Sequence, residues 1–195
     1  RVLSNAGLVT DALFSEVTGN GEQDLLIATE WGTLRLFENR GARFVDITEE
    51  VGLNEYNGWW NGITVGDFTG NGLPDIVALN IGLNSAYQIH DNKPIRMYYD
   101  DFNWDGRLDI LETYYSHEIG SYVPRRKLHD FESVPTILSN VSTHKEFAEA
   151  SIEEIFDQPF NDVPYKEINT LKHIIFVNTG TAFEPKTLPA ETQFS

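Results

Sequence analysis

Three loops rich in aspartate, asparagine and glycine recur along this sequence, and they constrain its fold more than any other feature. The loops begin at residues 16, 67 and 101 and align without gaps. Each has an oxygen-bearing side chain at loop positions 1, 3, 5 and 9, glycine at position 6 and an apolar residue at position 10. Such repetition along one chain is typical of propellers, solenoids and other repeat folds.

The oxygen pattern of the loops predicts calcium coordination. Ca²⁺ takes about 6–8 oxygen ligands, and glycine at position 6 permits the sharp turn that such loops need. Position 7 would supply only its backbone carbonyl, so its side chain is free to vary. Ordinary Asx–Gly surface turns are the alternative for any single loop, but three loops in register favour a metal. The predicted ligands are Glu16, Thr18, Asn20, Glu22 and Asp24 in loop one, Asp67, Thr69, Asn71, Leu73 and Asp75 in loop two, and Asp101, Asn103, Asp105, Arg107 and Asp109 in loop three.

Loop three also matches the EF-hand pattern, because Glu112 stands at its twelfth position. An EF-hand requires a helix on each side of the loop. The flanking segments 95–99 and 110–115 are instead rich in β-branched and aromatic residues, which favour strands. We therefore expect a strand–loop–strand unit here, with a helical EF-hand as the alternative.

The segments around loop one predict a propeller blade. Four short apolar segments, 8–14, 25–28, 34–37 and 44–47, are separated by tight turns, which gives the strand count of one blade. The predicted fold is all-β, a partial β-propeller with a partly helical insertion in its last blade. Its predicted parts are one propeller segment over 1–195, with blades at 6–50, at 57–90 and at 91–115 plus 173–188, and an insertion at 116–172.

The split last blade rests on a recurrence of spacing. Phe37, Asn39, Gly41 and Phe44 recur at the same intervals at positions 176, 178, 180 and 183. We therefore expect the strand around Leu111 to pair with the strand around Phe176.

The intervening segment has a helical pattern. Thr143 and Glu146 form a capping box, and positions 148, 152, 155 and 156 share one helical face. This insertion is either a recognition element over one face of the propeller or a small packing subdomain.

Charge and composition exclude several classes of function. The 195 residues include 14 Lys and Arg against 30 Asp and Glu, a formal net charge of −16, which disfavours nucleic-acid binding. The absence of cysteine excludes disulfides and thiol chemistry. We expect no membrane insertion, because no apolar run approaches the length of a membrane helix. The chain begins without Met, and we expect a processed segment.

The linking segments resemble the FG-GAP/VCBS repeat family. The similarity lies in the three loops and in residues 45–53, 59–68, 80–85 and 148–156, the last two being similar to large secreted bacterial members. Members of that family form β-propellers whose aspartate-rich loops bind Ca²⁺ between the first two strands of a blade, and integrin α-chain heads use related loops. Glu16, Thr18 and Thr69 depart from the usual Asp or Asn.

The resemblance implies a calcium-stabilised extracellular module, secreted or at the surface of a bacterial cell. Its expected role is adhesion or the binding of a protein or carbohydrate ligand. Further blades, or a partner chain, would complete the propeller. Aromatic residues near turns, among them Trp31, Trp59 and Trp60, are either candidates for sugar or protein binding or residues that pack between blades, and packing is the favoured interpretation. The sequence favours a non-catalytic role, and the alternative is the propeller domain of a polysaccharide-active enzyme.

Overall fold

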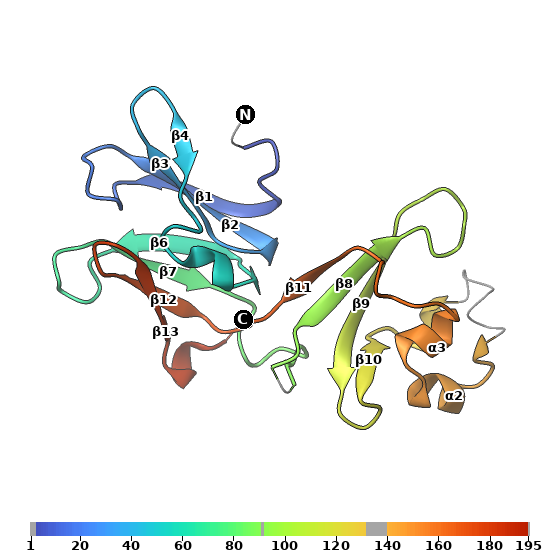
Figure 1. The fold of residues 1–195 in the computed structure, drawn as a ribbon. Helices are drawn as coiled ribbons and strands as arrows, with labels where there is room; N and C mark the ends of the chain where they lie inside the picture. Colours follow the sequence, from blue (N-terminus) through green and yellow to red (C-terminus); the bar gives the residue numbers. More distant parts are fainter. Residues whose placement is uncertain (1–2, 91, 132–139, 195) are drawn as a thin grey trace. The chain divides into compact units, whose positions relative to one another are not determined.

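A computed structural model describes residues 3–90, 92–131 and 140–194. The chain divides into two compact units, one formed by Arg1–Gln88 with Ile168–Ser195 and the other by Ile89–Glu167. Both are mostly antiparallel β-structure, in three sheets, and no sheet of the described residues closes on itself (Figure 1). No helix among the described residues is long and apolar enough to cross a membrane.

The first sheet contains the four strands predicted around loop one. Its order is β1-β2-β3-β4, and every neighbouring pair is antiparallel. A short strand, β5, pairs with the far end of β2, and a 3₁₀ turn, η1, precedes it. The bounds are β1 Leu8–Ser15, β2 Asp24–Gly32, β3 Arg35–Asn39, β4 Phe44–Asp46, η1 Leu53–Glu55 and β5 Gly58–Trp59.

The second sheet joins strands that lie far apart in the sequence. Its order is β13-β12-β7-β6, and Phe176 of β12 lies opposite Ile76 of β7 (Figure 1). Loop two connects β6 to β7, so β12 and β13 supply the outer hairpin of this sheet. The bounds are β6 Gly62–Gly66, β7 Asp75–Leu79, β12 Ile174–Asn178 and β13 Phe183–Thr187, followed by η3 Ala190–Thr192.

The third sheet shows that the predicted pairing of Leu111 with Phe176 is wrong. Its order is β10-β9-β8-β11, and Leu111 lies on β9 between two other strands. Because β9 has no free edge, β12 pairs with β7 instead, and the long excursion runs from about residue 80 to residue 173. The cost of closing a loop rises only slowly with its length, so this longer excursion is tolerated. The bounds are β8 Ile95–Asp100, β9 Asp109–Ser116, β10 Ser121–Pro124, η2 Leu128–Phe131 and β11 Tyr165–Ile168.

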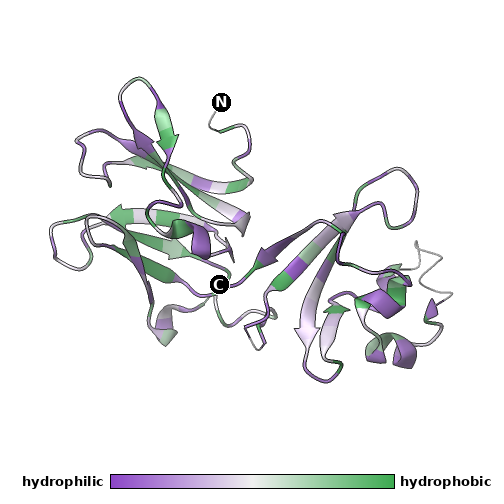
Figure 2. Cartoon of the chain, in the orientation of Figure 1, coloured by the Kyte–Doolittle hydropathy of each residue, from purple (hydrophilic) through white to green (hydrophobic). Residues whose placement is uncertain are grey.

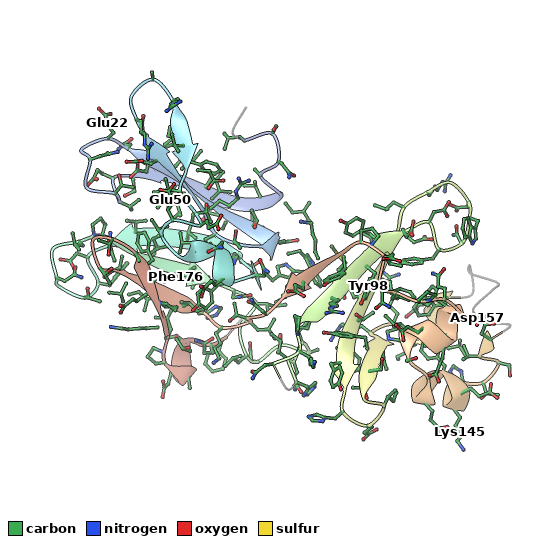
Figure 3. All side chains as sticks on the ribbon, in the orientation of Figure 1. Glu22, Glu50, Tyr98, Lys145, Asp157 and Phe176 are labelled. Atoms are coloured by element: carbon green, nitrogen blue, oxygen red, sulfur yellow. The ribbon has the colours of Figure 1, made fainter. Side chains whose placement is uncertain are left out.

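The first unit has one core between its two sheets. Leu26 and Leu36 of the first sheet pack with Ile76 and Phe176 of the second, and Trp60 is fully buried among them. In Figure 2, β6 and β7 are mostly hydrophobic, and Figure 3 shows Phe176 within this side-chain layer. Burying a large apolar side chain contributes about 1.5–3 kcal/mol, so this junction fixes the positions of loops one and two.

The second unit packs two short helices, α2 His144–Glu149 and α3 Ile152–Phe156, with its sheet. The predicted capping box of Thr143 and Glu146 is present. The prediction of a single helix is wrong, because Ser151 caps a second helix through its own box with Glu154. Because Ser151 caps the second helix, the first helix ends before it, at Ala150, whose backbone is extended.

Candidate metal-binding loops

The aspartate at the ninth position closes loops one and two in the same way. Oδ2 of Asp24 accepts hydrogen bonds from the amides of Val17 and Thr18, each at 3.1 Å. Oδ2 of Asp75 accepts from the corresponding two amides of loop two, at 3.1 and 3.0 Å. Both aspartates are 0% exposed. These carboxylates therefore hold the loop against the start of the following strand.

The other oxygen of each buried aspartate reaches the third strand of its sheet. The amide of Asn39 donates to Oδ1 of Asp24 at 2.9 Å, and the amide of Asn178 donates to Oδ1 of Asp75 at the same distance. The two asparagine side chains then donate back to the carbonyls that precede the aspartates, at 3.0 and 3.1 Å. The sequence analysis found these asparagines by their spacing but missed this bracing role.

A shared turn at positions 5 to 7 appears in all three loops. The side-chain oxygens of Asn20, Asn71 and Asp105 each accept the amide two residues onward, at 2.8, 2.8 and 2.9 Å. The chain then turns through the glycine at position 6, whose φ is positive in every loop. The register predicted from sequence is therefore present in the backbone.

The first position differs between the loops. Asp67 accepts three amides, those of Gly70, Asn71 and Gly72, at 2.7, 3.1 and 3.0 Å. Glu16 has the longer side chain, and its oxygen accepts the amide of Gly19. Loop two is thus organised from its first residue more completely than loop one.

Loop three differs from the other two loops in its ninth-position aspartate, which is not fully buried. Asp101 accepts the amides of Asp105 and Gly106 at 3.0 and 2.8 Å, and Asp109 accepts that of Phe102 at 3.2 Å. Asp105 is exposed, and Asp101 and Asp109 are half-buried. The oxygens of this loop are therefore closer to solvent than the buried aspartates of the other two loops.

The flanks of loop three are strands, as predicted. Residues 96–100 of β8 pair antiparallel with 109–113 of β9. Glu112 lies on β9 and pairs with Arg125, with Nε 3.8 Å from the carboxylate. The helical EF-hand alternative is therefore wrong, and the glutamate at position 12 has a structural partner.

The donor chemistry of the loops fits Ca²⁺, and one atom is an independent sign of a missing ligand. Oγ1 of Thr18, at the third position of loop one, is buried and has no hydrogen-bond partner among the described residues. A buried hydroxyl without a partner is costly, and a bound cation would satisfy it. No group of three or more His, Asp or Glu side chains converges in the described part of the chain, so backbone and amide oxygens would complete any site.

Burial decides between the two interpretations of the tryptophans near turns. Trp31 and Trp60 are buried, so they are not an exposed sugar platform.

The second unit has an open cleft of about 750 Å³ between β10 and α3, and its lining includes Glu153, Glu154 and Asp157. Hydrogen bonds from Ser151 lower the pKa of Glu154. Nothing in the linear pattern placed these acids together, because their spacing is that of an ordinary solvated helix.

The comparisons with known proteins bear on loops one and two. The FG-GAP-like repeat model matches residues 17–78. This chain contains an FG-GAP-like repeat. The matched stretch runs from loop one to β7, and loop three lies outside it. A comparison with curated proteins gave no match. The FG-GAP-like repeat and its antiparallel sheets together indicate a β-propeller-type module.

Proposed function

We propose that this chain is a calcium-binding extracellular β-propeller module, secreted or at the surface of a bacterial cell, that serves in adhesion or in binding a protein or carbohydrate ligand. The observation that best supports calcium binding is Oγ1 of Thr18, which has no hydrogen-bond partner among the described residues. It lies in a loop whose other odd positions also have oxygen-bearing side chains. The shared turn of the three loops supports extending the assignment to loops two and three.

Calcium would be held in the same manner in each loop. Side-chain oxygens at positions 1, 3 and 5 and the carbonyl at position 7 would face the ion, with the ninth-position aspartate behind them. The bound ion supplies positive charge, which offsets the repulsion among carboxylates in a chain of net charge −16. The chain's own contribution is the fixed loop backbone, which the two buried aspartates hold in place without metal.

Calorimetric titration of the EDTA-treated chain with Ca²⁺ tests the metal. We expect saturable binding and a rise in melting temperature, since a ligand present at 100 times its Kd adds about 2.7 kcal/mol per site. Mg²⁺ is the matched control, because it prefers a rigid octahedral site and retains water. An unchanged melting temperature after EDTA at low salt would overturn the proposal.

A polysaccharide-active enzyme is the second candidate, and the acidic cleft of the second unit favours it. Glu153 and Asp157 line this cleft, and glycosidases act through two carboxyl groups. Screening a set of glycans for binding and for cleavage separates the two candidates. Binding without cleavage supports the ligand-binding module, and cleavage that Asp157→Asn abolishes supports the enzyme.

A further inference from the structure

The two sheets of the first unit have the same strand pairing at equivalent positions. They pack together through opposite faces, so that one face of the first sheet contacts the other kind of face of the second. Phe14 pairs with Leu25 in the first sheet as Val65 pairs with Ile76 in the second. The outer hairpins correspond equally well, since Asn39 lies opposite Phe44 as Asn178 lies opposite its own phenylalanine. Each sheet therefore has two distinguishable faces, a head face and a tail face.

The inner junction joins the tail face of the first sheet to the head face of the second. The head face of the second sheet is formed by Ile63, Val65, Ile76, Ala78, Ile174, Phe176 and Phe183, and all of these belong to the core between the sheets. The tail face of the first sheet is formed by Leu13, Leu26, Ala28 and Leu36, and these belong to the same core. Within the first unit, no other sheet packs on the head face of the first sheet or on the tail face of the second among the described residues.

The free head face belongs to the first sheet and is apolar. Its inner residues Leu25, Ile27 and Phe37 are already buried, at 7, 5 and 0% exposure, so the surface that a partner would contact is formed by Ala12, Phe14 and Phe44. Phe14 is 59% exposed, and its ring lies 6.2 Å from that of Phe44. The equivalent of Phe44 in the second sheet, Phe183, is buried. A position that is buried at the inner junction is thus only half-buried here.

The free tail face belongs to the second sheet. It is formed by Thr64, Val77, Leu79 and Ile175, which correspond to the four tail residues at the inner junction. Leu79 is 46% exposed, whereas its equivalent, Ala28, is 0% exposed. The tail face of the second sheet is therefore the kind of surface that packs on a head face at the inner junction, and the head face of the first sheet has no such partner within the first unit.

A polar contact points to the same arrangement. Nδ2 of Asn178 donates to its own loop and also, at 3.0 Å, to the carbonyl of Val17 in the neighbouring sheet. Nδ2 of Asn39 donates to the carbonyl of Gln23 at 3.0 Å, and no neighbouring sheet supplies a second acceptor among the described residues. The residue that corresponds to Val17 in the loop alignment is Phe68, which is 54% exposed.

We propose that a second copy of this chain docks on the free head face, presenting its own free tail face in the manner of the inner junction. The Asn39 side chain would then donate to the second copy's Phe68 carbonyl. Such an interface is heterologous, so it generates rings or open chains of copies rather than a closed pair. The inference rests on the blade architecture of the proposed function and not on calcium.

Analytical ultracentrifugation of the chain, at about 0.5 M salt, tests the proposal. High salt shortens the screening length to about 4 Å and weakens the repulsion between copies that each carry −16. We expect association that rises with concentration, and at least about tenfold weaker association for Phe14→Glu, since an exposed aromatic anchor carries much of an interface. Leu108→Glu is the matched control, because it adds the same charge at an exposed leucine of loop three. A chain that stays monomeric, or equal effects of the two variants, overturns the proposal.

Mixing two variants tests the head-to-tail geometry. Phe14→Glu keeps an intact tail face and Leu79→Glu keeps an intact head face, so an equimolar mixture forms one interface only. We expect each variant alone to be a monomer and the mixture to stop at a 1:1 dimer. A mixture that remains monomeric overturns the head-to-tail arrangement, provided that circular dichroism shows both variants folded; Ala12→Glu replaces Phe14→Glu if that variant unfolds. Running the series in Ca²⁺ and in EDTA separates failure of this interface from failure of calcium binding.

Discussion

The amide of Asn178 donates to Oδ1 of Asp75 at 2.9 Å across 103 residues of sequence. This hydrogen bond ties β12 to the loop end of β7, and it repeats the bond between Asn39 and Asp24 inside the first sheet. Loop three has Asp109 at the same position, but β10 lies beside β9 there, and Asp109 is only half-buried. In the first unit, the buried aspartate and its asparagine thus form a matched pair that braces the third strand of each sheet.

Replacing the asparagine of this pair should destabilise the first unit. In Asn178→Ala, the carbonyls of Val17 and Pro74 and the amide of Gly180 lose their partners. We expect a loss of about 1–3 kcal/mol, the usual cost of leaving buried polar groups unpaired. Urea unfolding measures it. Asn39→Ala is the matched control and should cost less, because Asn39 is half-buried and its side chain makes no bond across the junction. Equal losses would contradict a contribution from the bond between Asn178 and the Val17 carbonyl.

Thr18→Val should have opposite effects with and without calcium. The substitution nearly preserves the shape of the side chain and removes the partnerless Oγ1. Without metal we expect the variant to be at least as stable as the parent, by up to about 1 kcal/mol, since a buried unsatisfied group is costly. With saturating Ca²⁺ the parent should be the more stable of the two. Thermal melts in EDTA and in Ca²⁺ measure both, and a variant that gains as much from calcium as the parent would remove Thr18 from the site.

Loop three should bind calcium most tightly. At positions 1, 3, 5 and 9 it offers three carboxylates, Asp101, Asp105 and Asp109, against two at the same positions in each other loop, and higher ligand charge generally tightens calcium sites. Asp101→Asn and Asp67→Asn are matched changes at the first position of loops three and two. We expect the former to remove the highest-affinity step of a calorimetric titration and the latter to leave it. The reverse order would reject this ranking.

The local parts of the fold could be predicted, and the long-range pairing could not. The strands of the first sheet, the loop register and the capping box of Thr143 each depend on neighbouring residues, so the pattern alone was sufficient. The outer hairpin at 174–187 was also recognised, but it was assigned to the nearer loop three. Its true partner, β7, is determined by which strand edge stays free, and edge availability is a property of the assembled sheets.

The turns of the three loops were predicted at the level of residue types, and their calcium ligands stay a prediction. The oxygen positions and the glycine turns are where the spacing placed them. The aspartates of the loops differ in burial, because Asp24 and Asp75 are fully buried and Asp105 is exposed to solvent. The sequence assigned all ninth-position aspartates one role, and the second role, holding the third strand, depends on contacts that local spacing does not encode.

Acid should weaken the first sheet through Asp46. Burial acts to raise the pKa of Asp46, but hydrogen bonds from Thr48 and Arg35 outweigh it, and the pKa is lowered from its ordinary value. A carboxyl group with a lowered folded-state pKa contributes stability that is fully present above its unfolded pKa, about 3.9. This contribution is lost as the pH falls through the lower folded-state value.

Asp46→Asn should therefore be less stable than the parent at pH 6, and the difference should shrink as the pH falls below about 4. Urea unfolding at a series of pH values measures it. Glu191→Gln, at an exposed carboxylate in η3, is the matched control and should show no such trend. A difference between Asp46→Asn and the parent that stays constant down to pH 2 would show that packing of the side chain, and not its charge, stabilises the hairpin of β3 and β4.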